Sequence, residues 1–386
     1  MKKCLLILTV VLLSLHACRK EPYAGSDDNF SNKLSVQNDD IPAICTKVVY
    51  AGTMTLSQAR YGLAGAGTAN RILFAGGRDG FGEVTNRVDI YNVSTNSWLI
   101  SNLSIARMGM AAAGIQNKVF FAGGWNADNI VYSRVDIYDV STNVWSTAEL
   151  SQPRYNLSAV AFGDKVMFAG GNKTGAAYSS RVDIYDLSTN SWSTAELSSE
   201  RNELAAAATG NQIFFGGGAY SKQVDIYDIP TGSWSTSLLS EGRPQLAGGG
   251  AANKALFAGG MDFTGSPYSG KIDIYNVSTG TWSVAALSAE RTELSSAAHK
   301  NYIFFAGGRG NLPAFTNVDI FKASSGSLSS ANLSQARYSL ASGCASNTVM
   351  FAGGRRSDFT ASRIVDVFKI KYCWDLPITA TKSKQL

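Results

Sequence analysis

The stretch LFAGGRDG, residues 73–80, decides the fold because it is one of seven near copies. In each copy an apolar run ends in two adjacent glycines, and a polar loop follows. The other six are FFAGG at 120–124, MFAGG at 167–171, FFGGG at 214–218, LFAGG at 256–260, FFAGG at 304–308 and MFAGG at 350–354. A segment that returns at a fixed interval is typical of a repeat architecture.

Other residues keep the same phase as the glycines. An arginine lies sixteen residues before the first glycine of each pair, and the repeat period is 42–48 residues. The seven arginines are Arg60, Arg107, Arg154, Arg201, Arg243, Arg291 and Arg337. An aspartate follows each glycine pair, within a VDIY-like segment: Asp89, Asp136, Asp183, Asp225, Asp273, Asp319 and Asp366. In five repeats a tryptophan stands nine residues after this aspartate.

Each repeat divides into four segments of strand character joined by turn-prone residues. Examples are YGLAGAG at 61–67, RILFAGG at 71–77, RVDIYNV at 87–93 and SWSTAEL at 191–197. Four antiparallel strands, repeated radially, make one blade of a β-propeller. The sequence therefore predicts an all-β fold, a seven-bladed propeller, with the small residues of the first strand next to the crowded axis.

The order of arginine, glycine pair, tyrosine and tryptophan at this period resembles the kelch motif, over roughly residues 46–376. The resemblance implies a propeller whose glycines serve backbone geometry, since glycine tolerates positive φ and close approach of a neighbouring chain. Some bacterial kelch propellers are sugar mutarotases, and copper radical oxidases contain kelch-type propellers. The resemblance does not extend to the histidine ligands of those oxidases.

Ring closure is expected from the two ends of the repeat region. The last repeat lacks a fourth strand, whereas a fourth-strand segment, CTKVVYAGTMTLSQAR at 45–60, precedes the first arginine. The N-terminal strand should therefore complete the seventh blade and remove a free sheet edge. Cys45 and Cys373 both fall where the missing turn should be, which predicts a disulfide between them and leaves Cys344 as a buried thiol.

The N-terminus has the features of an export signal. Two lysines and an apolar run too short to span a bilayer end in LHAC, which resembles a bacterial lipobox with Cys18 as the lipidated residue. An ordinary secretory signal is the alternative. We expect a signal peptide at 1–17, a flexible tether at 18–41, the propeller at 42–376 and a tail at 377–386. The protein would then be an exported lipoprotein, periplasmic or on the cell surface.

Composition excludes several function classes. The formal charge is +5, or +3 without the two N-terminal lysines, and no basic cluster occurs, which argues against nucleic acid as a partner. After signal removal the only histidine is His299, so a histidine-rich metal site and a Ser-His-Asp triad with a second histidine are not expected. No cofactor is expected, and the chain is expected to be a monomer.

The working face is expected to carry the loops after each glycine pair and the segments around each arginine. Aromatic or apolar residues there are Tyr61, Met108, Trp125, Tyr155 and Tyr338, and polar residues of the facing blades are Glu203, Gln245 and Glu293. The seven arginines have two interpretations. Each can pair with the aspartate of its repeat inside the blade, or remain available to a ligand.

Three functions fit this sequence. The leading one is a binding module for a protein or glycan, because exposed aromatic residues beside polar groups suit either ligand. The second is a carbohydrate-processing enzyme such as a mutarotase or epimerase, with Glu203 and Glu293 as the acid/base pair, which rests on fold analogy. The third is a structural spacer. The sequence names no ligand.

Overall fold

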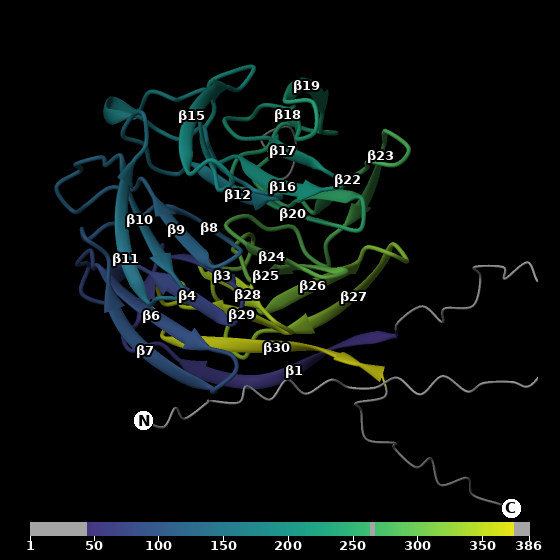
Figure 1. Ribbon diagram of the computed structural model, residues 1–386. Coiled ribbons are helices and arrows are strands. Elements are labelled where there is room, and N and C mark those ends of the chain that lie inside the picture. Colours follow the sequence, from purple (N-terminus) through teal and green to yellow (C-terminus); the bar gives the residue numbers. More distant parts are fainter. Residues whose placement is uncertain (1–44, 263–266, 374–386) are drawn as a thin grey trace, which may run out of the picture. The chain divides into compact units, whose positions relative to one another are not determined.

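The computed structural model describes residues 45–262 and 267–373. The expected signal peptide with Cys18, the tether and the tail lie outside the described residues. The described chain folds into seven four-stranded antiparallel sheets (Figure 1). Their innermost strands contact one another in a closed cycle, from β3 through β28 and back to β3. The prediction of a seven-bladed all-β propeller is therefore confirmed.

The strands of a blade follow the chain outward from the axis. The innermost strands are β3 (Ala64–Thr68), β8 (Ala111–Ile115), β12 (Ser158–Phe162), β16 (Ala205–Thr209), β20 (Ala247–Ala251), β24 (Ser295–His299) and β28 (Ala341–Ala345). The second strands are β4 (Arg71–Ala75), β9 (Lys118–Ala122), β13 (Lys165–Ala169), β17 (Gln212–Gly216), β21 (Lys254–Ala258), β25 (Tyr302–Ala306) and β29 (Thr348–Ala352).

The third strands are β6 (Arg87–Asn92), β10 (Arg134–Asp139), β14 (Arg181–Asp186), β18 (Gln223–Asp228), β22 (Lys271–Asn276), β26 (Asn317–Lys322) and β30 (Ile364–Tyr372). The outermost are β7 (Ser97–Asn102), β11 (Val144–Glu149), β15 (Ser191–Glu196), β19 (Ser233–Leu238), β23 (Thr281–Ala286), β27 (Ser327–Asn332) and β1 (Thr46–Thr55). The two-residue strands β2 (Arg60–Tyr61) and β5 (Arg78–Asp79) pair with each other.

The helical content of the described chain is one short 3₁₀ turn, η1 (Thr174–Ala176). Within these residues no helix has the length and apolar character needed to cross a membrane.

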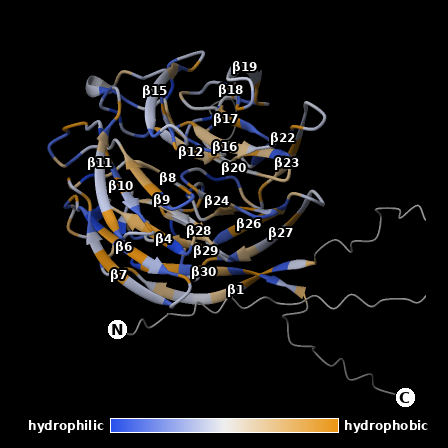
Figure 2. Cartoon of the chain, in the orientation of Figure 1, coloured by the Kyte–Doolittle hydropathy of each residue, from blue (hydrophilic) through white to orange (hydrophobic). Residues whose placement is uncertain are grey.

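The core lies between adjacent blades, and strand composition explains this. Second strands such as β9 are apolar on both faces because a neighbouring blade covers each face, and Phe120 and Phe121 are fully buried. In Figure 2 the inner strand β9 is largely orange and the outer strand β15 largely pale. The rings of Tyr91 and Trp98 lie 5.0 Å apart and pack within a blade, as expected for the tyrosine and tryptophan series.

The glycine pairs are required by backbone geometry. Gly76 has φ +63° and Gly77 has φ +95°, which side-chain-bearing residues rarely adopt. A Cβ atom at Gly76 would lie 2.4 Å from the carbonyl oxygen of Arg107 in the next blade. Both the turn and the close approach of the next blade therefore exclude a side chain, as the sequence predicted.

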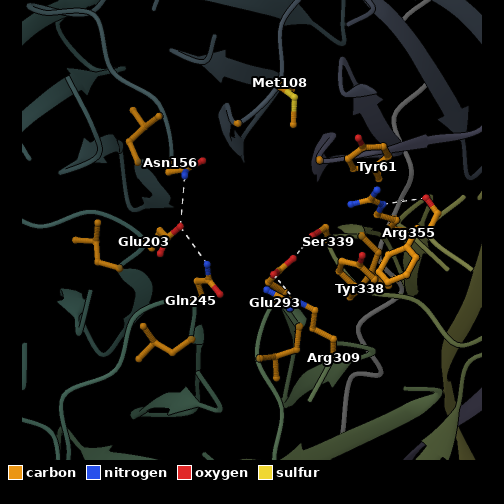
Figure 3. A pocket seen from close by; sticks show the side chains of 18 residues that line it. Tyr61, Met108, Asn156, Glu203, Gln245, Glu293, Arg309, Tyr338, Ser339 and Arg355 are labelled. Atoms are coloured by element: carbon orange, nitrogen blue, oxygen red, sulfur yellow. Dashed lines mark hydrogen bonds and ion pairs between the residues drawn. The ribbon is translucent and has the colours of Figure 1, made fainter. Parts of the chain in front are cut away.

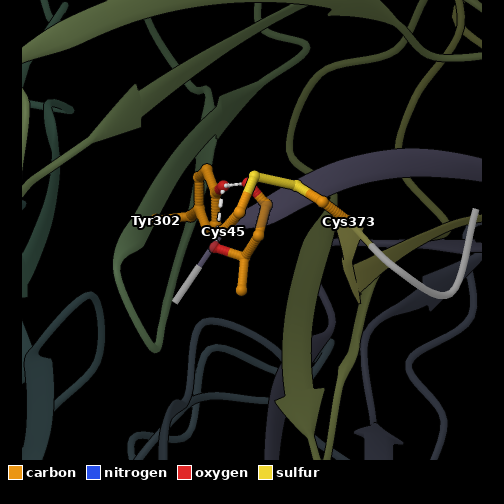
Figure 4. Close-up of a disulfide and its surroundings, with 4 residues drawn as sticks. Cys45, Tyr302 and Cys373 are labelled. Carbon is orange, nitrogen blue, oxygen red and sulfur yellow. Dashed lines mark hydrogen bonds between the residues drawn. A yellow bond between two sulfur atoms is a disulfide. The ribbon is translucent and has the colours of Figure 1, made fainter. Parts of the chain in front are cut away.

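The ring closes at blade seven, where β1 pairs antiparallel with β30. The predicted Cys45–Cys373 disulfide is present, with a Cα–Cα distance of 5.4 Å (Figure 4). The hydroxyl of Tyr302 also donates a hydrogen bond of 2.6 Å to the carbonyl oxygen of Thr46. The N-terminal strand is thus held both to its own blade and to blade six.

The two faces of the ring differ in what they carry. We call the side with the glycine-pair loops and the segments around the arginines the mouth face. The opposite side, with the hairpin turns, is the far face. Strand β30 begins near the mouth, because Arg337 Nη1 donates a 2.7 Å hydrogen bond to the carbonyl of Ile364. Its other end pairs with Thr46, so the disulfide lies at the far face.

Candidate functional site: the axial pocket

A pocket of about 640 Å³ opens on the propeller axis at the mouth face. Residues from all seven blades line it, and Figure 3 shows their side chains converging on it. The lining includes Tyr61, Met108, Asn156, Glu203, Gln245, Glu293, Arg309, Tyr338, Ser339, Arg355 and Phe359. Of the residues predicted for the site, six meet here: Tyr61, Met108, Tyr338, Glu203, Gln245 and Glu293.

The inner edge of this pocket is a ring of seven residues, one from each blade. We call it the axial ring: Gly62, Gly109, Asn156, Glu203, Gln245, Glu293 and Ser339. Each stands two positions after the arginine of its repeat. All seven have positive φ, from +50° to +65°. One backbone geometry thus occurs seven times with five different side-chain types.

The axial ring is closed by its own backbone hydrogen bonds. The amide of each member donates to the carbonyl oxygen of the member in the preceding blade, at 2.9–3.4 Å. The series ends where it began, because Gly62 N donates to Ser339 O at 3.1 Å. The backbone amides of the ring are therefore satisfied within the protein, and the side chains are left to determine what the pocket binds.

Five members of the ring hold a conformation that costs free energy. A non-glycine residue in the left-handed region pays of order 1–3 kcal/mol, and such residues cluster at binding and active sites. Glycine would avoid this cost and occurs in blades one and two. There a Cβ atom would lie 2.9 Å from Met108 Cε at Gly62 and 3.0 Å from Trp125 Nε1 at Gly109. At the other five positions the backbone is strained, and a side chain projects into the pocket.

Glu203 is a carboxylate without a cationic partner among the described residues. Its Oε1 accepts hydrogen bonds from Gln245 Nε2 at 3.2 Å and Asn156 Nδ2 at 3.5 Å. Burial raises the pKa of Glu203, the negative charge of Glu293 raises it further, and the Gln245 hydrogen bond opposes both. The pocket therefore weakens the charged form of this carboxyl group.

Glu293 occupies the same ring position but is fully engaged. Its Oε1 accepts a charge-assisted hydrogen bond of 2.6 Å from Arg309 Nε. Its Oε2 accepts a hydrogen bond from the Ser339 hydroxyl. Both oxygens therefore have protein partners, and the positive charge of Arg309 balances the negative charge of the carboxylate.

An aromatic and cationic wall lies beside Glu293. The guanidinium of Arg309 lies 5.7 Å from the Tyr338 ring centroid, and that of Arg355 lies 5.1 Å from the Tyr61 centroid. Arg355 also lies 5.3 Å from the Phe359 ring. These are cation–π contacts. Tyr338 lines the pocket but is only 6% exposed, since Arg309 covers its ring.

Trp125 and Tyr155 do not line the axial pocket. Their rings lie 5.9 Å apart and form one wall of a separate pocket of about 170 Å³, between the loops of blades two and three. Lys173 and Asn129 complete this side pocket. Tyr155 has the same repeat position as Tyr61, but its ring packs against Trp125 and lines the side pocket instead.

The structure decides between the two interpretations of the seven arginines, in favour of pairing inside the blade. All seven are at most 1% exposed, and each pairs with the aspartate of its own repeat. Arg60 Nη1 also donates to the carbonyls of Gly76 and Arg87, at 2.9 and 2.6 Å. Burial lowers the pKa of Arg60 to about 10, and Asp89 opposes this shift, so the guanidinium stays charged at neutral pH. Arg60, Arg107, Arg154, Arg201, Arg243, Arg291 and Arg337 belong to the blades, not to the pocket.

Each aspartate has a second structural role. The other carboxylate oxygen of Asp89 accepts the amide of Ser57 at 2.8 Å, and the other six aspartates accept the corresponding serine amide at 2.7–3.0 Å. The arginine–aspartate pair thus fixes the segment that leads into the axial ring.

The tips of the glycine-pair loops expose large apolar side chains, one of which, Phe359, also lines the axial pocket. We call these residues the apolar rim: Phe81, Ile130, Tyr178, Tyr220, Leu312 and Phe359. Phe81 is 95% exposed and Phe359 63%. The sequence predicted aromatic residues in these loops but missed Ile130 and Leu312, and Phe315 is buried. The loop of blade five contains residues 263–266, which lie outside the described part.

Below the axial ring the channel is lined by small and apolar residues. Leu157, Leu204, Leu246, Leu294 and Leu340 form the floor of the pocket. Cys344 is in the channel wall with Sγ 3.5 Å from the Ala298 carbonyl, and burial raises its pKa to about 11, so the thiol stays protonated. Residues 45–262 and 267–373 contain no group of three His, Cys, Asp or Glu that could hold a metal ion.

Four pocket residues were missed by sequence reasoning: Asn156, Ser339, Arg309 and Arg355. A signal for the first two was present, because positions 62, 109, 156, 203, 245, 293 and 339 share one spacing from the arginines and mix glycine with polar residues. A position that accepts glycine or polar residues alike indicates positive φ. Arg309 and Arg355 directly follow a glycine pair, which places them on the mouth face.

Comparison with known families supports this architecture. The model of the KLHDC2/KLHL20/DRC7 Kelch-repeats domain matches residues 62–253, which cover blades one to four and the first strand of blade five. No curated protein matches the chain significantly. The remaining blades repeat the same sheet order and the same arginine–aspartate pair.

Proposed function

The chain belongs to the kelch-repeat family of β-propellers, a general protein-interaction scaffold, and we propose that it binds a partner protein at its mouth face. The axial ring and the apolar rim are the contact surface. A segment of the partner enters the axial pocket, and the rim packs around it.

The strained axial ring is the observation that carries this proposal. Five non-glycine residues keep positive φ where glycine would be unstrained. Their backbone hydrogen bonds do not need those side chains, because Gly62 and Gly109 make equivalent bonds. The five residues therefore keep a strained backbone conformation that the stability of the ring does not require. This favours a binding role for their side chains.

The rim supports a macromolecular partner over a small molecule alone. Six large apolar side chains, exposed on the face where the axial pocket opens, match the composition of protein interfaces. The far-face turns are mostly serine, threonine and asparagine, such as residues 94–96 and 141–143, and offer no comparable apolar surface.

A comparative capture experiment tests the proposal. Three forms of the full chain would be immobilised: wild type, a ring variant with Asn156→Gly, Glu203→Gly and Gln245→Gly, and a far-face variant with Thr95→Ala and Thr142→Ala. Extracts of the source cells would be passed over each, and bound proteins and glycans quantified by mass spectrometry. A protein held by wild type and the far-face variant but lost from the ring variant supports the proposal. Glycans alone with this pattern, or retention by the ring variant, contradict it.

For location, we propose export and lipid anchoring at Cys18. The support is the lipobox-like LHAC segment at residues 15–18. Metabolic labelling with a radioactive fatty acid should label wild type and leave Cys18→Ala unlabelled. Equal labelling of both, or of neither, would refute the anchor.

A second candidate is sugar chemistry at the same pocket, favoured by the raised pKa of Glu203. The engagement of Glu293 with Arg309 and Ser339 leaves Glu203 without a second free carboxylate. Proton NMR of reducing sugars would detect faster exchange between anomers. Exchange at the buffer rate with wild type, or an unchanged rate with Glu203→Gln, excludes this candidate.

A further inference from the structure

The axial pocket holds one carboxylate and one guanidinium whose charges the protein leaves uncompensated. For Glu203, both amide donors reach Oε1, and no described residue donates to Oε2. No described lysine or arginine lies within 4.0 Å of it. Burial of a carboxylate without a cation is costly. A ligand group that carries a positive charge would relieve this cost.

Glu293 is the carboxylate of the axial ring whose negative charge the protein does compensate. It has the same ring position and backbone conformation, with φ +51° against +52° for Glu203. Arg309 and Ser339 occupy its two oxygens. Around Glu203 the counterpart of Ser339 is Gln245, which donates to Oε1, but the position of Arg309 is occupied by Ala219. The difference between the two carboxylates is thus a difference in partners, not in geometry.

Arg355 is the uncompensated cation. Its Nε donates to the carbonyl oxygen of Phe359 at 2.9 Å, and the Tyr61 and Phe359 rings hold its guanidinium. No described carboxylate pairs with it, whereas the adjacent Arg356 pairs with Asp358 at 3.4 Å. The terminal nitrogens of Arg355 have no protein acceptor among the described residues and remain available for two parallel hydrogen bonds to a carboxylate.

The two groups lie on opposite sides of the pocket. In Figure 3, Glu203 lies between Asn156 and Gln245, and Arg355 lies across the opening beside Tyr61. We infer that the axial pocket takes a dipolar ligand, with a primary ammonium group against Glu203 and a carboxylate against Arg355. This inference rests on the proposed function. In a partner protein, a lysine and an acidic side chain of the inserted segment supply the two charges.

Simple electrostatics favours the dipolar ligand over either charge alone. A single cation at Glu203 leaves Arg355 uncompensated, and a single anion at Arg355 leaves Glu203 uncompensated. A second charged hydrogen bond should therefore strengthen binding by about tenfold or more.

Linear ω-amino carboxylates of increasing chain length are direct probes. Each carries one ammonium and one carboxylate at a set separation. Binding to the full chain would be measured by saturation-transfer NMR, with butylammonium and hexanoate as single-charge comparisons. We expect one chain length to bind about tenfold more tightly than either single-charge probe. Equal binding of dipolar and single-charge probes would overturn the inference.

Matched variants identify the two subsites. Glu203→Gln should remove the advantage of the dipolar probe over hexanoate, and Arg355→Gln the advantage over butylammonium. The controls are Glu200→Gln, which alters a surface carboxylate paired with Lys173, and Arg356→Gln. These controls should bind like wild type. Thermal unfolding of each variant would verify folding. Wild-type probe binding by folded Glu203→Gln or Arg355→Gln refutes the assignment.

The outcomes separate this inference from the proposed function. If the ring variant loses its partner protein but dipolar probes bind no better than single-charge probes, the mouth is the binding face and the dipolar assignment is wrong. If dipolar probes bind as expected but no protein depends on the ring, the pocket chemistry stands and the partner is not a protein.

Discussion

Two positions in each repeat, only two residues apart, behave in opposite ways. The first is an arginine in every blade, fully buried and paired with an aspartate. The second is the axial ring residue, which is glycine, asparagine, glutamate, glutamine or serine at one shared backbone conformation. The first position is uniform because every blade needs the same frame. The second is free to vary because its backbone is satisfied whatever the side chain is.

Breaking one of the buried arginine–aspartate pairs should have the largest effect on stability. Arg154→Gln leaves Asp183 buried without its cation, and removal of one partner of a buried pair costs about 3–5 kcal/mol. Urea unfolding would measure this loss. Molecules that remain folded should still bind the dipolar probes. A loss below about 1 kcal/mol would contradict the structural role of the arginines.

Removal of the Cys45–Cys373 disulfide tests how much this covalent closure of blade seven contributes to the stability of the propeller. The disulfide closes a loop with a sequence separation of 328 residues, for which the chain-entropy account gives about 5 kcal/mol and measured losses are usually 2–4 kcal/mol. Cys45→Ser with Cys373→Ser should therefore lower the free energy of unfolding by about 2–4 kcal/mol. Cys344→Ser, which makes no disulfide, serves as the control. Equal stability of the double variant and wild type would show that the disulfide does not stabilise the propeller.

Within the axial ring, Glu293 and Glu203 should respond differently to the same substitution. Glu293→Gln removes the ion pair with Arg309, whose side chain is 40% exposed, so the loss should be about 1 kcal/mol or less. Glu203→Gln removes a carboxylate that has no cation and should leave stability unchanged or raised. Urea unfolding of both variants side by side would show this. A larger loss for Glu203→Gln would reverse our comparison.

The pH dependence of Glu203 is the finest test. Its pKa in the folded state is raised above the ordinary value of 4.5, so the folded state binds this proton more tightly than the unfolded state. The resulting stability is fully present at acid pH and is lost as pH rises through the raised pKa. Wild type should therefore lose stability relative to Glu203→Gln as the pH rises from 4.5 towards neutrality. A constant difference across this range would contradict the raised pKa.

Much of the fold could be predicted because repetition makes a weak local signal strong. The sixteen-residue spacing from Arg60 to Gly76 recurs in every repeat, and a missing last strand together with a spare first strand required closure at the N-terminus. The cysteine positions then predicted the Cys45–Cys373 bond. The spacing alone could not decide whether the arginines were free or paired, since both arrangements require the same residues.

The site was harder to predict because it depends on the direction in which each side chain points and on the residues that contact it. Tyr155 and Tyr61 share a sequence position, but Tyr61 meets Arg355 at the axial pocket while Tyr155 meets Trp125 at the side pocket. Glu203 and Glu293 also look equivalent in sequence. They differ because Arg309 reaches Glu293, whereas the corresponding position in blade four is Ala219 and supplies no cation.

The central claim is that the side chains of the axial ring serve binding and not stability. The most direct measurement is urea unfolding together with probe binding for the ring variant Asn156→Gly, Glu203→Gly and Gln245→Gly. Relief of positive-φ strain should offset the added chain entropy of glycine, so the free energy of unfolding should be within about 1 kcal/mol of wild type. The dipolar probes should bind no better than hexanoate, because the variant keeps Arg355 but lacks the carboxylate of Glu203. A ring variant that unfolds more easily by several kcal/mol, or that binds the probes like wild type, would contradict the account.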